Sequence, residues 1–310
     1  MKSNKRESSE DGTIGYFLDI LGDNPTSRAK STLRAIQDLV ESLPEYIAYP
    51  NTGMATGEEI KYLTWTFETS EFDQIEILHL TDTQFGQLKC NVKKLVEYRD
   101  WVLSVPNRFV VFGGDMIDAA TVASPGEPWD NFCSPQRQVY KFCELLAPMR
   151  HRILGYVGGN HEARSMRFFG NLGILISSLL QIPYSSGQQF VNIVYGKHKP
   201  FKVFLWHGSG SARTAGARMQ KLYYAMKELS GNAHATLLGH YHDAMIKAST
   251  WRDHDYEKNR VVDKKIFGAI SSSFLDYFGT YAEAAGLSPS SLIMARIILG
   301  PDGHWELTIR

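Results

Sequence analysis

The chain of 310 residues has little cysteine and no net charge. Cys90, Cys133 and Cys143 are too few and too scattered for a disulfide framework, and none forms the C-x-x-C pair of a structural zinc site. Lysine plus arginine and aspartate plus glutamate both number 33. A chain without net charge is not expected to coat nucleic acid or an anionic membrane through bulk charge, although a local basic groove is compatible with it.

Long apolar runs and an apolar leader are also missing. The longest apolar stretches, such as Leu172–Leu180, are far shorter than a membrane span requires. The first residues, MKSNKRESSEDG, are polar and lack the apolar core of a signal peptide. We therefore expect a soluble, cytoplasmic protein with three reduced cysteines and no membrane partner.

The chain does contain a repeated order of strand, loop and helix. Residues 1–12 are polar and predicted to be disordered, and helical periodicity follows over Thr13–Leu21 and Ser27–Leu43. The order predicts a layered α/β fold, with an N-terminal extension over residues 1–70 and a catalytic domain over residues 71–310. The expected strands cover residues 60–68, 75–81, 109–112, 153–157, 201–206, 235–238, 264–271, 291–299 and 304–309, and the expected helices of the domain cover residues 91–105, 136–146 and 212–229.

Five successive predicted strands of the domain end in polar side chains that can bind metal ions. Because ligands bind at the carboxyl ends of strands in open α/β sheets, we expect these side chains to converge. Carboxylate, carboxamide and imidazole groups suit divalent ions such as Mn, Fe, Zn, Co or Ni, and one carboxylate can bridge two ions. In strand order, the candidates are Asp82 and Gln84, then Asp115 and Asp118, then Asn160 and His161, then His207, and last His240 and His242.

The sequence around these candidates resembles the calcineurin-like metallophosphoesterase superfamily. The stretches HLTDTQFG, FGGDMID, GGNHE, WHG and LGHYH resemble the family blocks D-x-H, G-D-x-x-D, G-N-H-[DE], a lone His and G-H-x-H, in the family order. The resemblance covers about residues 75–245. It implies a layered sandwich of two mixed β-sheets flanked by helices. The segment Ser271–Pro289 resembles the C-terminal part of phage and prophage members.

The resemblance also implies an activity: hydrolysis of a phosphate mono- or diester, of a nucleotide or nucleic acid, by metal-activated water. It assigns His161 to the scissile phosphate, as electrophile or general acid, and Asp118 to a hydrogen bond that fixes the tautomer of His161. The cofactors would be two divalent ions, with Mn favoured and Fe, Zn, Mg or Ni as alternatives. One ion would be held by Asp82, Gln84 and His242, the other by Asn160, His207 and His240, and Asp115 would bridge them.

One residue departs from the family pattern, because Gln84 stands where the family has histidine. A carboxamide oxygen is a harder and weaker ligand than imidazole, so the first metal site is expected to be loose and biased toward Mn or Mg. The alternative is that Gln84 is a solvent-facing loop residue. Asp118 has a similar alternative, as an ordinary acid at a helix N-terminus without a link to His161.

Other functions remain open at the level of sequence. A DNA-processing nuclease of the superfamily's repair branch and a catalytically weak scaffold that retains the fold are both alternatives. A protein phosphatase is disfavoured, since Ala119 and Ala120 stand where those enzymes have Arg-Gly. Arg164 and Arg167 either grip substrate phosphate or lie on a solvated helix face. His79 and the aromatic run Phe274, Tyr277, Phe278 and Tyr281, which has helical spacing, are expected to be core residues.

Overall fold

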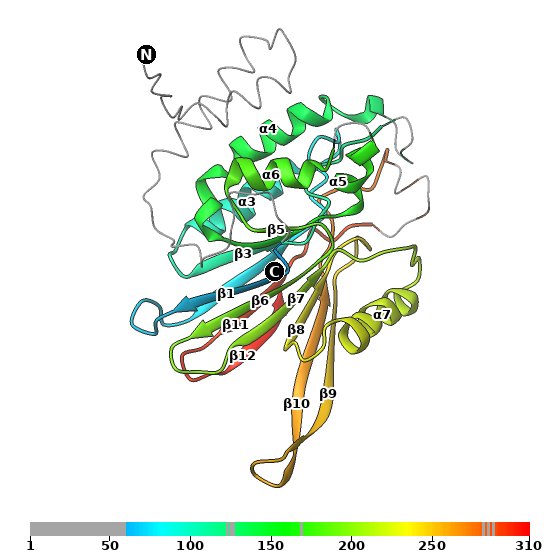
Figure 1. Cartoon of the computed structure of the whole chain (residues 1–310). Helices are drawn as coiled ribbons and strands as arrows, with labels where there is room; N and C mark the ends of the chain where they lie inside the picture. Colours follow the sequence, from blue (N-terminus) through cyan, green and yellow to red (C-terminus); the bar gives the residue numbers. More distant parts are fainter. Residues whose placement is uncertain are drawn as a thin grey trace, which may run out of the picture. The chain divides into compact units, whose positions relative to one another are not determined.

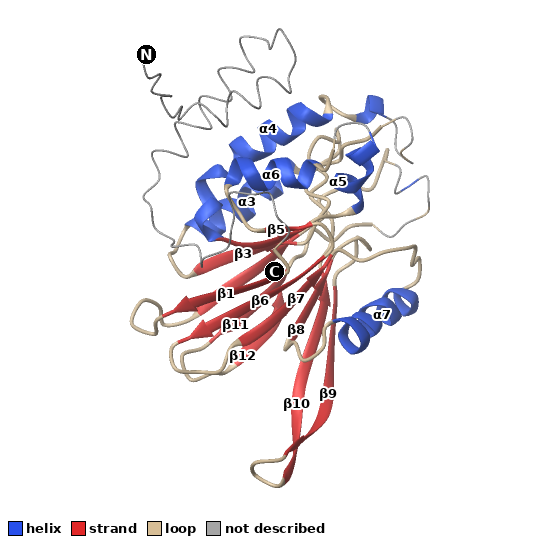
Figure 2. Cartoon of the chain, viewed as in Figure 1, coloured by secondary structure: helices blue, strands red, loops and turns tan. Residues whose placement is uncertain are grey.

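The computed structural model describes residues 60–121, 124, 128–167, 170–280, 283, 286 and 289–310, with the side chain of residue 167 left undescribed. These residues belong to one compact unit. Within them, twelve strands form two six-stranded sheets, and helices lie beside both (Figures 1 and 2). The predicted class, two mixed β-sheets flanked by helices, is therefore confirmed. The helices predicted over residues 13–21 and 27–43 lie outside the described residues.

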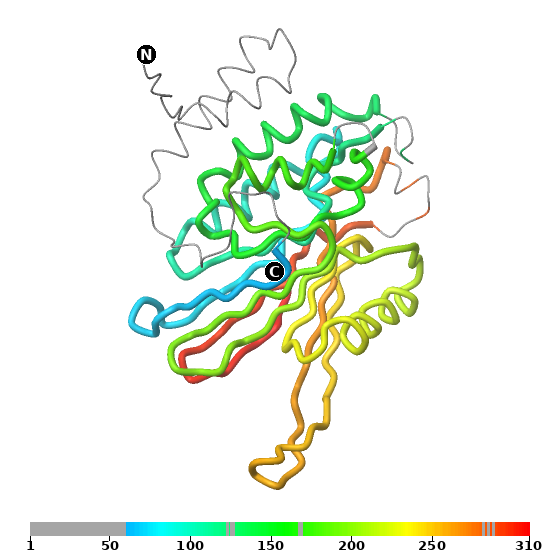
Figure 3. Tube along the Cα trace, in the orientation of Figure 1, coloured from blue at the N-terminus to red at the C-terminus, as the bar shows by residue number. Residues whose placement is uncertain are grey.

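The first sheet combines parallel and antiparallel pairs. In spatial order it contains β1 (Tyr62–Phe67), β6 (Gln188–Tyr195), β7 (Phe201–Trp206), β8 (Ala235–Leu238), β10 (Arg260–Ile270) and β9 (Met245–Asp255). Pairs β1–β6, β7–β8 and β8–β10 are parallel, whereas β6–β7 and β9–β10 are antiparallel. Figure 3 shows β1 in blue beside β6 in green. The strand predicted over residues 60–68 is thus part of the sandwich, although it precedes residue 71, where the sequence placed the start of the catalytic domain.

The second sheet carries the first three predicted ligand loops. Its order is β12 (Trp305–Ile309), β11 (Ala295–Leu299), β2 (Ile75–Leu80), β3 (Arg108–Phe112), β4 (Ile153–Val157) and β5 (Tyr184–Ser185). The pairs from β2 through β5 are parallel, and β11 pairs antiparallel with both of its neighbours. Sequence analysis missed β5, β6 and β9. The edge strand β9 (MIKASTWRDHD) has no buried residue and therefore no apolar face to reveal it.

The predicted helices of the domain are present with shifted ends. They are α3 (Val92–Leu103), α4 (Pro135–Leu146) and α7 (Ala215–Tyr224), which continues as a π-helical turn over Ala225–Leu229. α3 packs on β3, and α7 packs on β9 and β10. Two further helices, α5 (Asn160–Arg164) and α6 (Leu172–Leu180), were not predicted. Short 3-10 turns cover Pro128–Asp130, Ala147–Arg152 and Ser165–Arg167.

The helical spacing of the aromatic run at Phe274 was misleading. Residues 274–280 form bends and turns without a helix. Phe274 is fully buried as expected, but Phe278 is 75% exposed, so its assignment to the core was wrong. Tyr281 lies outside the described residues. Apolar spacing over so few residues does not distinguish a helix from a series of turns.

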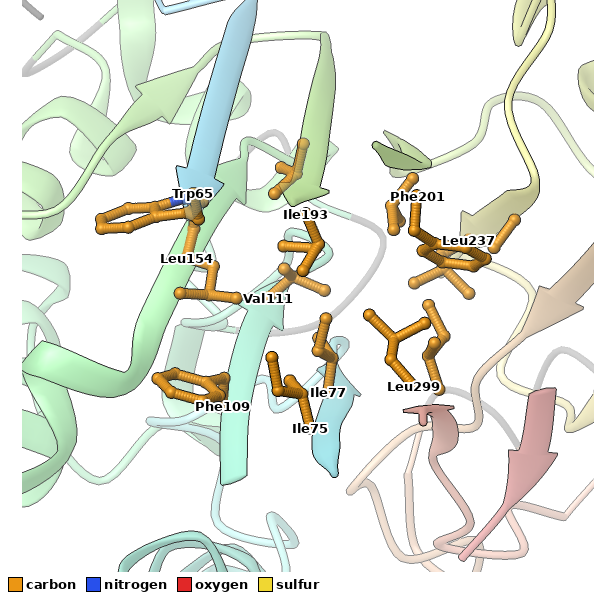
Figure 4. Close-up of a cluster of buried hydrophobic side chains, with 14 of the residues drawn as sticks. Trp65, Ile75, Ile77, Phe109, Val111, Leu154, Ile193, Phe201, Leu237 and Leu299 are labelled. Carbon is orange, nitrogen blue, oxygen red and sulfur yellow. The ribbon is translucent and has the colours of Figure 1, made fainter. Parts of the chain in front are cut away.

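A cluster of buried apolar side chains from both sheets forms the core (Figure 4). It includes Ile77 from β2, Leu154 from β4, Ile193 from β6 and Leu237 from β8. Trp65 joins the sheets directly, since its indole nitrogen donates to the Leu154 carbonyl at 2.8 Å. Each such side chain contributes about 1.5–3 kcal/mol on burial. This apolar interior fixes the sheets, and with them the loops at the strand ends.

Two further findings bear on the expectations drawn from composition. The three cysteines are unpaired, as expected. Among the residues that the structure describes, no helix combines the length and apolar character needed to cross a bilayer.

Candidate metal centre

The structure brings the predicted ligands together at the carboxyl ends of strands from both sheets. The loops after β2 and β3 carry Asp82, Gln84 and Asp115, Asn160 is the first residue of α5 after β4, and the loops after β7 and β8 carry His207, His240 and His242. Parallel strands that share an edge present their following loops on the same side. The candidate centre therefore straddles the two sheets.

One group of donors surrounds Asp115. The ligand atoms of Asp115, His207 and His240 all lie within 4.8 Å of one another. Nε2 of His207 is 3.1 Å from Oδ2 of Asp115 and 3.2 Å from Oδ1 of Asn160. Nδ1 of His207 is 2.8 Å from the Gly113 carbonyl, which accepts its proton, and this contact leaves Nε2 as the ring nitrogen that faces the group. These four residues are the predicted second metal site together with the bridging carboxylate.

The other group contains Asp82, Gln84 and His242. Nε2 of His242 is 3.2 Å from Oδ1 of Asp82 and 3.1 Å from the amide nitrogen of Gln84. Asp82 and Gln84 are fully buried. The alternative that Gln84 faces solvent was therefore wrong. Its role as a metal ligand stays a prediction, since its burial beside His242 places it at the site without showing what it binds.

The backbone of the ligand loops is strained. Non-glycine residues rarely adopt a positive φ, because the Cβ atom then approaches the following carbonyl, at a cost of about 1–2 kcal/mol per residue. Strain of this kind gathers at functional sites, where the surrounding structure enforces it. Five of the seven predicted ligands adopt it: Asp82 (φ 50°), Gln84 (44°), Asp115 (52°), His240 (70°) and His242 (54°).

His161 lies between two carboxylates. Its backbone N–H donates to Oδ1 of Asp115 at 2.8 Å, and its Nε2 is 3.5 Å from Oδ2 of the same residue. Its Nδ1 is 2.7 Å from the Asp118 carbonyl and 3.3 Å from the Asp118 carboxylate. The alternative that Asp118 has no link to His161 was therefore wrong. Both acceptors beside Nδ1 favour a proton there.

Charge complementarity sets the protonation of this cluster. Burial raises the pKa of Asp115, but His161 and His207 outweigh burial and hold that pKa well below its ordinary value. Burial lowers the pKa of His207, but the Asp115 and Asp82 carboxylates outweigh it and raise that pKa to about 10. Burial also lowers the pKa of His161, but the Asp115 and Asp118 carboxylates outweigh burial, and the pKa is raised above its ordinary value. The carboxylates thus stabilise positive charge beside them, here on the imidazole groups.

Glu162 is a site residue that sequence analysis did not assign. Its buried carboxylate accepts the backbone N–H groups of Asp115 (3.0 Å), Met116 (2.7 Å) and Gly159 (2.9 Å), and the Tyr156 hydroxyl (3.0 Å). Burial and the nearby Asp115 raise its pKa. Glu162 ties the loop after β3 to the start of α5. A glutamate three residues after the turn that opens a helix is a capping signal, and this signal was available in the sequence.

Two other predictions have different outcomes. His79 is a buried core histidine, as expected, and its Nδ1 is 2.8 Å from the Ser271 hydroxyl. Burial lowers the pKa of His79 to about 3, so this imidazole is neutral in the folded protein. Arg164 is half-buried at the end of α5, and its proposed contact with substrate phosphate stays a prediction.

Comparisons with known proteins give weak likenesses. No protein-family model and no curated protein matches the chain. A conserved uncharacterized protein of Streptococcus pneumoniae, described as a predicted phosphoesterase, is 17% identical (TM-score 0.33) over 77% of this chain and 99% of its own. Haemophilus influenzae NAD nucleotidase is 9% identical, with a TM-score of 0.34, over 76% of this chain and 49% of its own. A Saccharomyces cerevisiae serine/threonine phosphatase is 10% identical, with a TM-score of 0.37, over 97% of this chain and 96% of its own. Likenesses at this level do not identify an activity.

Proposed function

We propose that this chain is a metal-dependent phosphoesterase that hydrolyses a phosphate mono- or diester of a nucleotide or nucleic acid. The observation that carries the proposal is the convergence of Asp115, His207 and His240, whose ligand atoms come from three different strand ends to within 4.8 Å of one another. Carboxylate and imidazole groups are the donors that borderline divalent ions take in proteins, so their convergence favours a bound cation.

The donor set fits two divalent ions. Asp82, Gln84 and His242 would hold one ion, Asn160, His207 and His240 the other, and Asp115 would bridge them. A bound pair supplies a nucleophilic water at neutral pH and stabilises the attacking and leaving oxygens of the ester. The amide oxygen of Gln84 favours Mn over Zn at the first position.

The side chains around the ions hold and move protons. His161 keeps one proton on Nδ1, where Asp118 accepts it, and presents Nε2 on the side of Asp115. A protonated Nε2 donates to the phosphate during attack and passes its proton to the leaving oxygen. Glu162 holds the backbone of Asp115 and Met116 and thereby keeps the bridging carboxylate in place.

The alternatives from sequence carry less support. A catalytically weak scaffold is expected to lose ligands, whereas this chain has a side chain that can bind metal at each of the seven predicted positions. Two more specific forms of the phosphoesterase proposal are that the chain is a phage-type member of the superfamily and that its substrate is DNA. The experiment below includes linear DNA as a substrate for that reason.

The test is a screen of metal ions against substrates. Metal-free protein is loaded with Mn, Mg, Zn, Ni or Fe, its metal content is measured by mass spectrometry, and hydrolysis of nitrophenyl phosphate, bis-nitrophenyl phosphate and linear DNA is followed. We expect two ions per chain and activity with Mn. His207→Gln should lose one ion and the activity, whereas His198→Gln, a change at an exposed histidine, should keep both. Folded protein that binds no metal and cleaves no ester contradicts the proposal.

A further inference from the structure

Two amide side chains outside the matched sequence blocks lie behind Asp118. Gln138, on α4, is fully buried. Its Oε1 accepts the Ala119 backbone N–H at 2.8 Å, and its Nε2 donates to the Cys133 carbonyl at 3.0 Å and to Oδ1 of Asn131 at 2.6 Å. Nδ2 of Asn131 then donates to Oδ2 of Asp118 at 2.8 Å. A continuous chain of hydrogen bonds therefore runs from α4 to the carboxylate beside His161.

The direction of this chain is fixed by backbone groups. An amide side chain can usually be turned by half a revolution to exchange its oxygen and nitrogen. Gln138 cannot be turned without loss, because the Ala119 N–H can only donate and the Cys133 carbonyl can only accept. The fixed amide of Gln138 presents N–H to Asn131, and Asn131 in turn presents N–H to Asp118. Oδ2 of Asp118 is thereby supplied with a donor, and Oδ1 lies 3.3 Å from Nδ1 of His161, which also contacts the Asp118 carbonyl at 2.7 Å.

The loops around Gln138 approach its side-chain amide closely. Gly86 lies against its amide, and a Cβ atom at position 86 would stand 2.1 Å from Cδ of Gln138. Gly86 also has a φ of +118°, which other residues rarely adopt. Ala119 has a positive φ of 47°, and its N–H meets Oε1 of Gln138. The backbone at Gly86 thus leaves room for the Gln138 amide, and the backbone at Ala119 hydrogen-bonds to it.

We infer that Gln138 and Asn131 are positioning residues that, through Asp118, orient His161 so that its Nε2 faces the leaving group. This inference rests on the proposed phosphoesterase function. As the bond between phosphorus and the ester oxygen breaks, the Nε2 proton moves to that oxygen, and solvent returns a proton to Nε2 before the next turnover. Neither Gln138 nor Asn131 touches substrate, because both act through Asp118.

Gln138→Glu is the sharpest test. Glutamate keeps the acceptor for Ala119 but removes the donor to Asn131, so the Asn131 amide is expected to turn and present its oxygen to the Asp118 carboxylate. Turnover of phenyl phosphate, whose leaving group needs a proton, should fall about tenfold or more, and turnover of nitrophenyl phosphate much less. KM for both esters should change little. Gln136→Glu, the same exchange two positions earlier on α4 at a half-buried side chain, should behave as the parent.

A second measurement does not depend on activity. In metal-free protein with ¹⁵N-labelled histidine, the Nδ1–H signal of His161, assigned with His161→Asn, should be present in the parent and in Gln136→Glu. It should weaken or shift in Gln138→Glu and in Asn131→Leu, a variant that serves equally if Gln138→Glu does not fold.

The two measurements separate failure of the inference from failure of the proposed function. An unchanged His161 signal and an unchanged ratio of phenyl to nitrophenyl turnover in both variants overturn the positioning role. A parent protein that hydrolyses neither ester with any metal overturns the proposed function. In that case the NMR comparison still decides whether Gln138 and Asn131 orient His161.

Discussion

The interior between the sheets and the loops at the strand ends both contain fully buried residues, but these residues differ in chemical type: they are apolar in the interior and polar or charged in the loops. Ile77 in β2 is 1% exposed, and Asp82, five residues further along the same chain segment, is 0% exposed. Ile77 lies among apolar side chains of both sheets with ordinary strand backbone. Asp82 lies among imidazole and carboxylate groups with a positive φ. Burial alone therefore does not reveal what a residue contributes.

The difference predicts how stability and the proposed activity are divided in this chain. Apolar burial in the sandwich stabilises the fold, whereas strained backbone and buried carboxylates at the strand ends cost stability. Hydrogen bonds such as those to Glu162 offset part of that cost by fixing the loops. We therefore expect substitutions in the two regions to change different measured quantities, and the predictions below test that division.

The largest expected effect is on stability, at Ile77. Ile77→Ala should lower the free energy of unfolding by about 2–5 kcal/mol, since it removes buried methyl groups and leaves a cavity. Metal content and turnover of the remaining folded protein should change little. Urea denaturation of metal-free protein measures the effect. Ile309→Ala, at a side chain that is 48% exposed in β12, is the matched control and should cost far less. A similar loss in both variants would contradict the division between the regions.

Asp115→Asn should have the opposite profile. A neutral amide in place of the proposed bridging carboxylate removes charge from both proposed metal positions, so turnover should fall at least about a hundredfold. Circular dichroism should be unchanged, and the free energy of unfolding should change less than in Ile77→Ala. Activity within a few-fold of the parent would rule out the bridging role.

His79 shares a feature with each region: it is fully buried, like the residues of the apolar interior, and its side chain is polar, like those of the strand-end loops. Its pKa of about 3 in the folded protein lies below the ordinary value of 6.5. Between these values the unfolded chain binds one more proton, so His79 should destabilise the fold by about 1.4 kcal/mol per unit as pH falls below 6.5.

His79→Asn keeps a polar atom near the position of Nδ1 but does not titrate. Denaturation of metal-free protein between pH 4.5 and 6 should therefore show a shallower loss of stability with acid than the parent shows. His198→Asn, at an exposed histidine, should keep the parental slope. Equal slopes in all three proteins would mean that His79 is protonated while folded.

The smallest effect is expected at Gln84. Gln84→His introduces, beside His242, the histidine found at this position in the superfamily that the sequence resembles, and it should lower, by several-fold, the Mn concentration that gives half of maximal activity. Metal titration of activity, with metal content by mass spectrometry, measures the change. Gln220→His adds a histidine at an exposed position of α7 and controls for surface binding. An identical Mn requirement in the parent and Gln84→His would show that Gln84 is not a ligand.

Sequence analysis found the strands whose apolar residues are continuous or alternate, and it missed β5, β6 and β9. The runs at Ile75 and Ile153 predicted β2 and β4 because both strands are wholly buried. The strands β6 and β9 were missed, since glutamine and asparagine interrupt the first and charged residues the second. Side chains of an edge strand face solvent, and their sequence therefore carries little signal of the fold.

Sequence by itself determined which residue types follow which strands, and the resemblance to the metallophosphoesterase superfamily assigned seven of these residues as predicted ligands and set His161 and Asp118 apart from them. It did so because strand ends in an α/β fold are ordered along the chain and the motifs are local. Only the tertiary structure decided that Gln84 is buried, that Glu162 holds two loops, and that Gln138 and Asn131 lie behind Asp118. These contacts join segments from different strands and helices. Their partners are chosen by how the two sheets and α4 pack, and packing of distant segments leaves no local pattern in the sequence.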